Sequence, residues 1–89
     1  MTGAFDLIRL ERDRQAGLWG REHRWGHGDC SSEDVPDPVK AAVLMEECGE
    51  VARAMLNEDR DGLRRELIEV AAVAVAWWEA LSQVSRLGR

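Results

Sequence analysis

Apolar residues recur every three or four positions in three stretches of the chain, which is the spacing of an amphipathic helix. The sequence predicts helices at about residues 4–18, 37–57 and 60–86. The middle helix has a clear start signal, because Asp37 can cap a helix and Pro38 is well accepted in the first turn. The segment 57–62 (NEDRDG) is typical of a turn. The pattern therefore predicts an all-α protein whose second and third helices pack antiparallel.

A long polar segment separates the first two predicted helices. Residues 20–36 are rich in Gly, Asp, Ser, His and Pro, and they predict a loop. A loop of this length is uncommon in a compact domain and often carries function.

The third predicted helix carries carboxylates on its apolar side. On a helical wheel, its apolar face is formed by Val70, Val73, Trp77, Leu81 and Val84. Glu66 falls in the middle of this face and Glu69 at its edge. An ionised carboxylate that is buried without a partner is so unfavourable that it takes up a proton instead. No Lys or Arg occurs between Glu66 and Leu81, so a neutralising cation has to come from another segment or from solution.

The second predicted helix supplies three more carboxylates, Glu46, Glu47 and Glu50, which lie next to one another on one helix surface. Taken alone, they also fit an ordinary solvated helix face. The short turn at 57–62 brings both acidic clusters to a similar height, so we expect up to five carboxylates around one small volume. Hard divalent cations suit such all-oxygen sites, with Mg²⁺ first and Mn²⁺ as a substitute. Neither helix contains the histidines that di-iron bundles add.

Length and charge narrow the possible functions. The 89 residues form one small domain, and we expect homo-oligomerisation to complete its helical bundle. The net charge of −5 argues against nucleic-acid binding. The longest apolar run, Val70–Trp78, is far shorter than the roughly 20 residues that cross a membrane. The two cysteines form no CxxC motif, so we expect reduced thiols and a cytoplasmic protein.

The acidic segments resemble those of a known family. The stretches LMEECGEVARAM and ELIEVAAVAVAWWEAL are similar to the MazG-like nucleotide pyrophosphohydrolases, all-α enzymes whose pattern is EExxE, a spacer and ExxD. Glu46, Glu47 and Glu50 match the first half, and Glu66 matches the start of the second. Glu69 stands where the family usually has Asp. The segment ERDRQAGLWG also resembles the first helix of small, phage-type members.

The resemblance implies magnesium-dependent hydrolysis of a (deoxy)nucleoside triphosphate to the monophosphate and pyrophosphate, in a homodimer or homotetramer. The implied metal ligands are Glu46, Glu47, Glu50, Glu66 and Glu69. A carboxylate that is not fully used as a ligand, Glu46 or Glu47, could take the proton of the attacking water. The candidates for phosphate contacts are Lys40, Arg53 and Arg60. Trp19 and Trp25, beside the loop, are candidates for stacking on the base.

Two other interpretations stay open at this point. His23, His27 and Cys30 could hold zinc with Cys48 as a fourth ligand, although their spacing fits no common zinc-finger pattern. Alternatively, the helices form a non-enzymatic dimerisation or interaction module. In that case the acidic side chains point to solvent, and magnesium has no effect on the protein.

Overall fold

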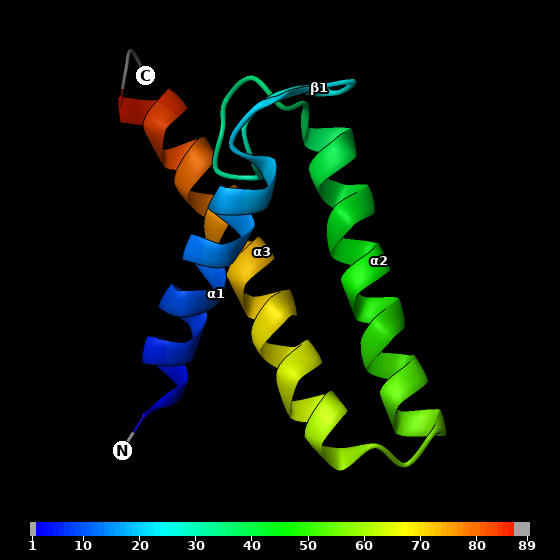
Figure 1. The fold of residues 1–89 in the computed structure, drawn as a ribbon. Coiled ribbons are helices and arrows are strands. Elements are labelled where there is room, and N and C mark those ends of the chain that lie inside the picture. Colours follow the sequence, from blue (N-terminus) through cyan, green and yellow to red (C-terminus); the bar gives the residue numbers. More distant parts are fainter. Residues whose placement is uncertain (1, 87–89) are drawn as a thin grey trace.

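Three helices make up most of the structure. The computed structural model describes residues 2–86, with side chains placed through residue 83. Helix α1 spans Ala4–Trp19, α2 spans Asp37–Leu56 and α3 spans Arg60–Arg86 (Figure 1). Each end lies within one residue of the predicted position. Within the described part of the chain, no helix combines the length and the apolar composition needed to cross a lipid bilayer.

Helices α2 and α3 form an antiparallel hairpin (Figure 1). The connection is tight: Glu58 adopts a positive φ of 54°, and the backbone N–H of Asp59 donates to the carbonyl of Ala54 at 2.9 Å. Asp59 then caps α3, because its carboxylate accepts the N–H of Gly62 at 2.9 Å and its carbonyl accepts the N–H of Leu63 at 2.8 Å. The turn thereby sets the two helices side by side with their acidic segments at comparable height.

The core is built mainly from small side chains of α3. Its most buried side chains are Ala72, Val73, Ala76 and Ala80, each at most 3% exposed. This stripe continues the line of Glu69 along the helix, whereas Leu81 on the predicted apolar face is 48% exposed. The wheel therefore placed the centre of the buried face too far toward Glu66. Alanine leaves room for backbones to approach closely, and α3 packs against both α2 and α1 on this account. The side chain of Val84 lies outside the described residues.

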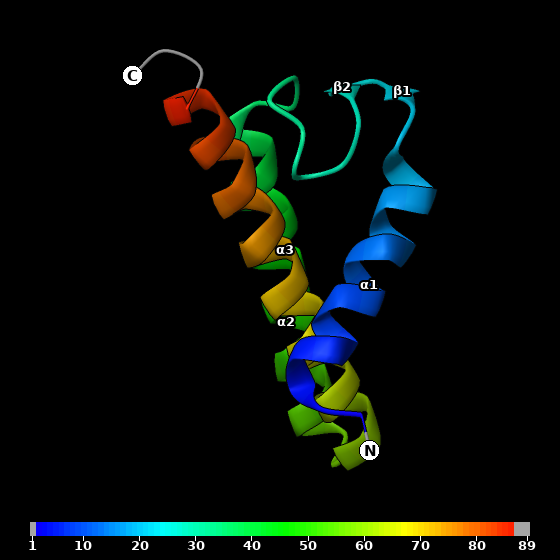
Figure 2. The ribbon, with the colours of Figure 1, turned by 90° about the vertical axis from the view of Figure 1, so that its left-hand side faces the viewer.

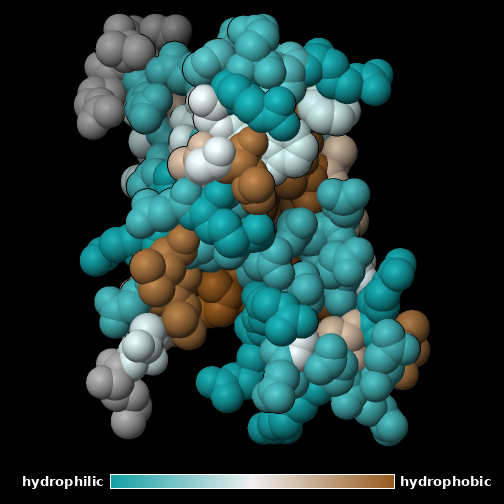
Figure 3. Space-filling model, in the orientation of Figure 1, coloured by the Kyte–Doolittle hydropathy of each residue, from teal (hydrophilic) through white to brown (hydrophobic). Residues whose placement is uncertain are grey.

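Helix α1 crosses α3 and has no buried residue of its own. Arg12 ties it to α3 through an ion pair with Glu79 at 2.7 Å. In Figure 2, the C-terminal end of α1 lies apart from α2 and α3, and the loop spans the distance between them. Figure 3 shows hydrophobic atoms exposed beside the start of α1, where Phe5 is 84% exposed and Leu10 is 61% exposed. The fold thus leaves considerable apolar surface uncovered.

The segment between α1 and α2 is more ordered than a plain loop. It contains two strands of two residues, β1 at Glu22–His23 and β2 at Gly26–His27, which pair antiparallel. The expectation of a purely helical fold is corrected by this small hairpin, which needs glycine at Gly26 (φ 131°) and Gly28 (φ 104°). The carboxylate of Asp34 accepts the N–H of His27 at 2.6 Å and anchors the hairpin to the following chain. These contacts therefore hold the segment in a defined conformation next to the helices.

Candidate metal centre and adjoining pocket

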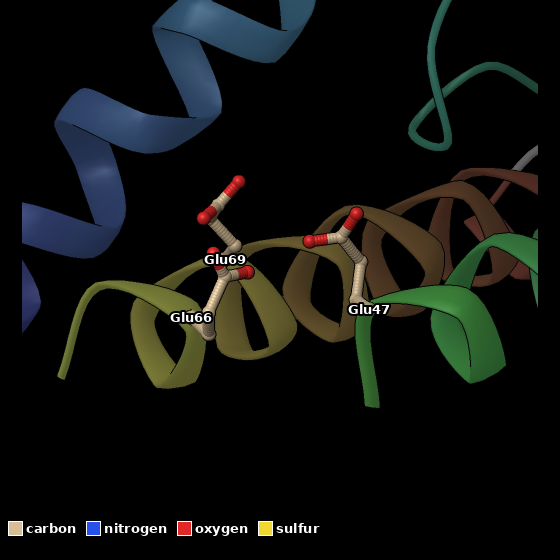
Figure 4. Close-up of side chains that lie close together, drawn as sticks. All are labelled: Glu47, Glu66 and Glu69. Atoms are coloured by element: carbon tan, nitrogen blue, oxygen red, sulfur yellow. The ribbon is translucent and has the colours of Figure 1, made fainter. Parts of the chain in front are cut away.

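Three carboxylates from two helices converge on one point. Glu47 projects from α2, and Glu66 and Glu69 project from successive turns of α3 toward it (Figure 4). One oxygen of each lies within 4.8 Å of the others, and all three side chains are half-buried. In an octahedral Mg²⁺ site, neighbouring oxygens are about 3 Å apart and opposite ones about 4.2 Å, so the three carboxylates would have to draw closer together to bind a single ion. The donor set is all-oxygen and fits a hard divalent cation.

The cluster is electrostatically strained without a cation. Burial, with repulsion from Glu66 next in size, raises the pKa of Glu69 from 4.5 to about 7. Burial and the neighbouring carboxylates, Glu66 first, also raise the pKa of Glu47. A divalent cation would offset this repulsion and favour the ionised form of both groups.

A cation from α1 stands beside the cluster. Arg14 contacts Glu69 through Nη2 at 3.3 Å, and the pKa of Glu69 is raised despite this contact. The same guanidinium forms a two-point pair with Glu11, at 2.8 Å from Nε and 2.7 Å from Nη2. Glu11 also accepts a hydrogen bond from Gln15 at 3.0 Å, and the Arg14 contact lowers the pKa of Glu11. The sequence predicted that a cation from another segment or from solution neutralises the cluster, but it did not identify Arg14.

A cavity of about 350 Å³ adjoins the cluster. Its acidic end is lined by Glu46, Glu47 and Glu69. Its other walls come from α1, the loop, α2 and α3, and they are mostly aromatic or apolar: Leu18, Trp19, His23, Trp25, Cys30, Val35, Val39, Val43 and Val73. A ligand with a charged end that binds metal and a flat, apolar end would match both parts of this cavity.

Both predicted base-stacking residues lie in the cavity wall, and a histidine contacts each of them. Trp19 and Trp25 both line the cavity. His23 makes an edge contact with Trp19, with ring centroids 5.7 Å apart, and lies 6.0 Å from Trp25. The carbonyl of Gly28 is 2.6 Å from Nε2 of His23 and fixes this ring. Sequence reasoning did not single out His23 for this position.

The remaining predicted residues are placed differently. Glu46 lines the cavity on an exposed position of α2 but is not part of the three-oxygen group. Glu50 is half-buried, and it belongs neither to the cavity lining nor to the three-oxygen group. Arg53 and Arg60 are exposed near the α2–α3 turn, away from the cavity lining. Lys40 is only 2% exposed, so the structure does not support it as a group that meets a phosphate from solution.

The structure gives no support to the zinc interpretation. Within residues 2–86, the three glutamates are the one group of His, Cys, Asp and Glu side chains close enough to share a metal. Cys48 is exposed on α2, and burial raises the pKa of the Cys30 thiol, which keeps it protonated. A protonated thiol is a poor zinc ligand.

One comparison with known proteins identifies a family for the segment that contains the carboxylates. Residues 39–83 match the family model of the MazG nucleotide pyrophosphohydrolase domain. This segment comprises most of α2 and α3 and contains all five glutamates of the two acidic clusters. No curated protein and no solved structure matches the chain at a significant level. Because the match covers just over half of the chain and includes the converging carboxylates, the protein belongs to the MazG nucleotide pyrophosphohydrolase domain family.

Proposed function

We propose that the protein hydrolyses a (deoxy)nucleoside triphosphate to the monophosphate and pyrophosphate with the help of Mg²⁺. The observation that carries this proposal is the convergence of Glu47, Glu66 and Glu69 beside a cavity whose other walls are mostly aromatic and apolar. The acidic end suits a cation that binds phosphates, and the aromatic end suits a base. Membership of the family supports the reaction type.

Each part of the cavity has a role in this proposal. Glu47, Glu66 and Glu69 would hold the cation, which neutralises the phosphates and stabilises the charge that develops during hydrolysis. Glu46 faces the same cavity and is not part of the three-oxygen group, so its carboxylate is free to accept the proton of the attacking water. Glu50 remains a candidate ligand one turn along α2. Trp19 and Trp25 would hold the base and orient the substrate.

The interaction-module interpretation is less favoured by the arrangement. It requires acidic side chains that point to solvent, whereas the three carboxylates are half-buried and face one another. The raised pKa values of Glu47 and Glu69 show that this arrangement opposes ionisation of the metal-free protein. Such an arrangement is unfavourable for a surface that has no ligand.

A nucleotide panel tests the proposed reaction directly. The purified protein is expected to release pyrophosphate from at least one of the common ribo- or deoxyribonucleoside triphosphates in the presence of Mg²⁺ or Mn²⁺. A chelator should stop the release, and added Mg²⁺ should restore it. If no nucleotide in the panel yields pyrophosphate with either metal, the enzymatic function is wrong.

The two tryptophans of the cavity should affect substrate affinity. Replacing Trp19 or Trp25 with alanine is expected to raise KM for the preferred nucleotide roughly tenfold, because stacking of one base on an aromatic ring is worth about 1–3 kcal/mol. The matched control is Trp78→Ala, which removes a 67% exposed tryptophan of α3 that does not line the cavity. Equal KM values for all three variants would exclude the base from the aromatic end.

We also infer that a second copy of the chain covers part of the apolar surface. Leu56 is 85% exposed and Met45 is 68% exposed, and the core of one protomer consists largely of alanine. Large apolar side chains exposed in this number are typical of a surface that another chain covers. Sedimentation analysis should give a dimer or a tetramer, and a monomer at micromolar concentration would disprove this inference.

A further inference from the structure

Arg14 has unused hydrogen-bonding capacity next to the carboxylate cluster. Its Nε and Nη2 are engaged by Glu11 and Glu69, and no side chain or carbonyl among residues 2–86 accepts a hydrogen bond from its Nη1. The side chain is 54% exposed and lines the cavity at its acidic end. The two-point pair with Glu11, itself 12% exposed, holds the guanidinium in this position.

The charge balance of the cavity requires a further cation when a triphosphate enters. One divalent cation does not offset three carboxylates, and the triphosphate adds several negative charges. Among the described residues that line the cavity, Arg14 is the one lysine or arginine. The candidates taken from the sequence, Lys40, Arg53 and Arg60, do not line it. Arg14 is therefore the side chain placed to supply the missing charge.

We propose that Arg14 binds the phosphate chain of the substrate and that Glu11 is the residue that positions it. In the metal-free protein, Arg14 leans on Glu69 at 3.3 Å. With a cation held by the carboxylates, Glu69 would be engaged by the ion, and Arg14 would be free to donate its N–H groups to phosphate oxygens while Glu11 keeps it in position. As a step in pyrophosphate release, this role rests on the proposed function; as phosphate binding, it is testable by itself.

The test compares two arginines of the same helix. Arg14→Gln removes the proposed phosphate contact, and Arg12→Gln removes an arginine that also pairs with α3, through Glu79 at 2.7 Å, but does not line the cavity. Binding of inorganic tripolyphosphate with Mg²⁺ is measured by calorimetry, because this probe has no base. Arg14→Gln is expected to weaken its binding roughly 10- to 100-fold, the size expected for a charged hydrogen bond, and Arg12→Gln should leave it unchanged. Arg14→Lys, which keeps the charge, should recover part of the loss.

A second measurement separates phosphate binding from a structural role. Mn²⁺ binding without phosphate should be no weaker in Arg14→Gln than in the wild type, because the variant removes a positive charge beside the metal ligands. Weakened Mn²⁺ binding together with a lowered melting temperature would show that Arg14 only supports the fold, and equal tripolyphosphate affinity in Arg14→Gln and Arg12→Gln would also overturn the proposal. If the affinity pattern holds but no nucleotide is hydrolysed, the proposed reaction fails and the phosphate role of Arg14 stands.

Discussion

Replacing Glu47 with glutamine is expected to lower the rate of pyrophosphate release by roughly 10²- to 10³-fold. Glu47 is the single contribution of α2 to the three-oxygen group, so its loss leaves only the two carboxylates of α3. The amide keeps the size of the side chain but cannot supply the negative charge that a cation needs. Binding of Mn²⁺, followed by calorimetry, should weaken about tenfold or more.

The same variant should not unfold. Glu47 repels its neighbours in the metal-free protein, which is part of the reason that the pKa of Glu69 is raised. Without metal, Glu47→Gln is therefore expected to melt at or above the wild-type temperature. The control is Glu33→Gln, in the exposed part of the loop and outside the cavity lining. Wild-type turnover in Glu47→Gln would remove this residue from the site.

Magnesium is expected to stabilise the protein much more at pH 8 than at pH 5.5. The pKa of Glu69 is about 7 in the folded protein against 4.5 when unperturbed, so the folded state binds more protons between these values. The free energy of unfolding of the metal-free protein should consequently fall as the pH rises from about 4.5 to about 7. The lowered pKa of Glu11 acts in the opposite direction, but below this window. A cation that binds the ionised cluster restores this lost free energy of unfolding, and it does so only at pH values where the cluster is ionised.

Thermal melts at matched ionic strength measure this effect. A magnesium concentration about tenfold above Kd should raise the melting temperature by roughly 5 °C or more at pH 8 and very little at pH 5.5. Glu69→Gln serves as the control, because it lacks the titrating carboxyl and should lose most of the pH dependence and of the magnesium effect. An equal magnesium shift at both pH values would contradict the assignment of Glu69 as a ligand.

Local sequence signals were sufficient for the helices and for placing acidic residues of α2 and α3 near each other. Of the five predicted ligands, Glu47, Glu66 and Glu69 converge, and their role in binding a metal stays a prediction. Pro38 lies in the first turn of α2 as predicted, but Asp37 is already part of the helix, and Pro36 occupies the N-cap position without a side-chain capping hydrogen bond. The turn at 57–62 allows only a short connection, so the two acidic segments had to meet. Helical periodicity put Glu69 on the inner side of α3, but at the edge of the apolar face rather than in line with the buried stripe that begins at Ala72. These features depend on residues near one another in the chain, and helix geometry converts their spacing directly into position.

Other features depend on contacts between distant segments, which no local pattern records. Arg14 contacts a glutamate that is 55 positions away in the chain, whereas its neighbours in the sequence are typical of a solvated helix face. Lys40 was expected to be accessible because lysines are rarely buried, yet it is only 2% exposed. The strands at 22–27 are too short to show an alternating pattern, and they depend on positive φ values at Gly26 and Gly28.

The tight connection at Asn57–Asp59 also bears on how the protein folds. Glu47 and Glu66 lie on the two sides of this connection, and their helices can pair progressively from the turn. Most contacts of the metal centre therefore form without help from more distant segments. Local contacts of this kind form quickly, since little chain entropy is lost in closing a short connection. The helical hairpin should therefore assemble first and carry a nearly complete metal centre, while α1 and the loop dock later and finish the wall that faces the base. The metal centre and the part of the cavity that contacts the base would thus form at separate stages of folding.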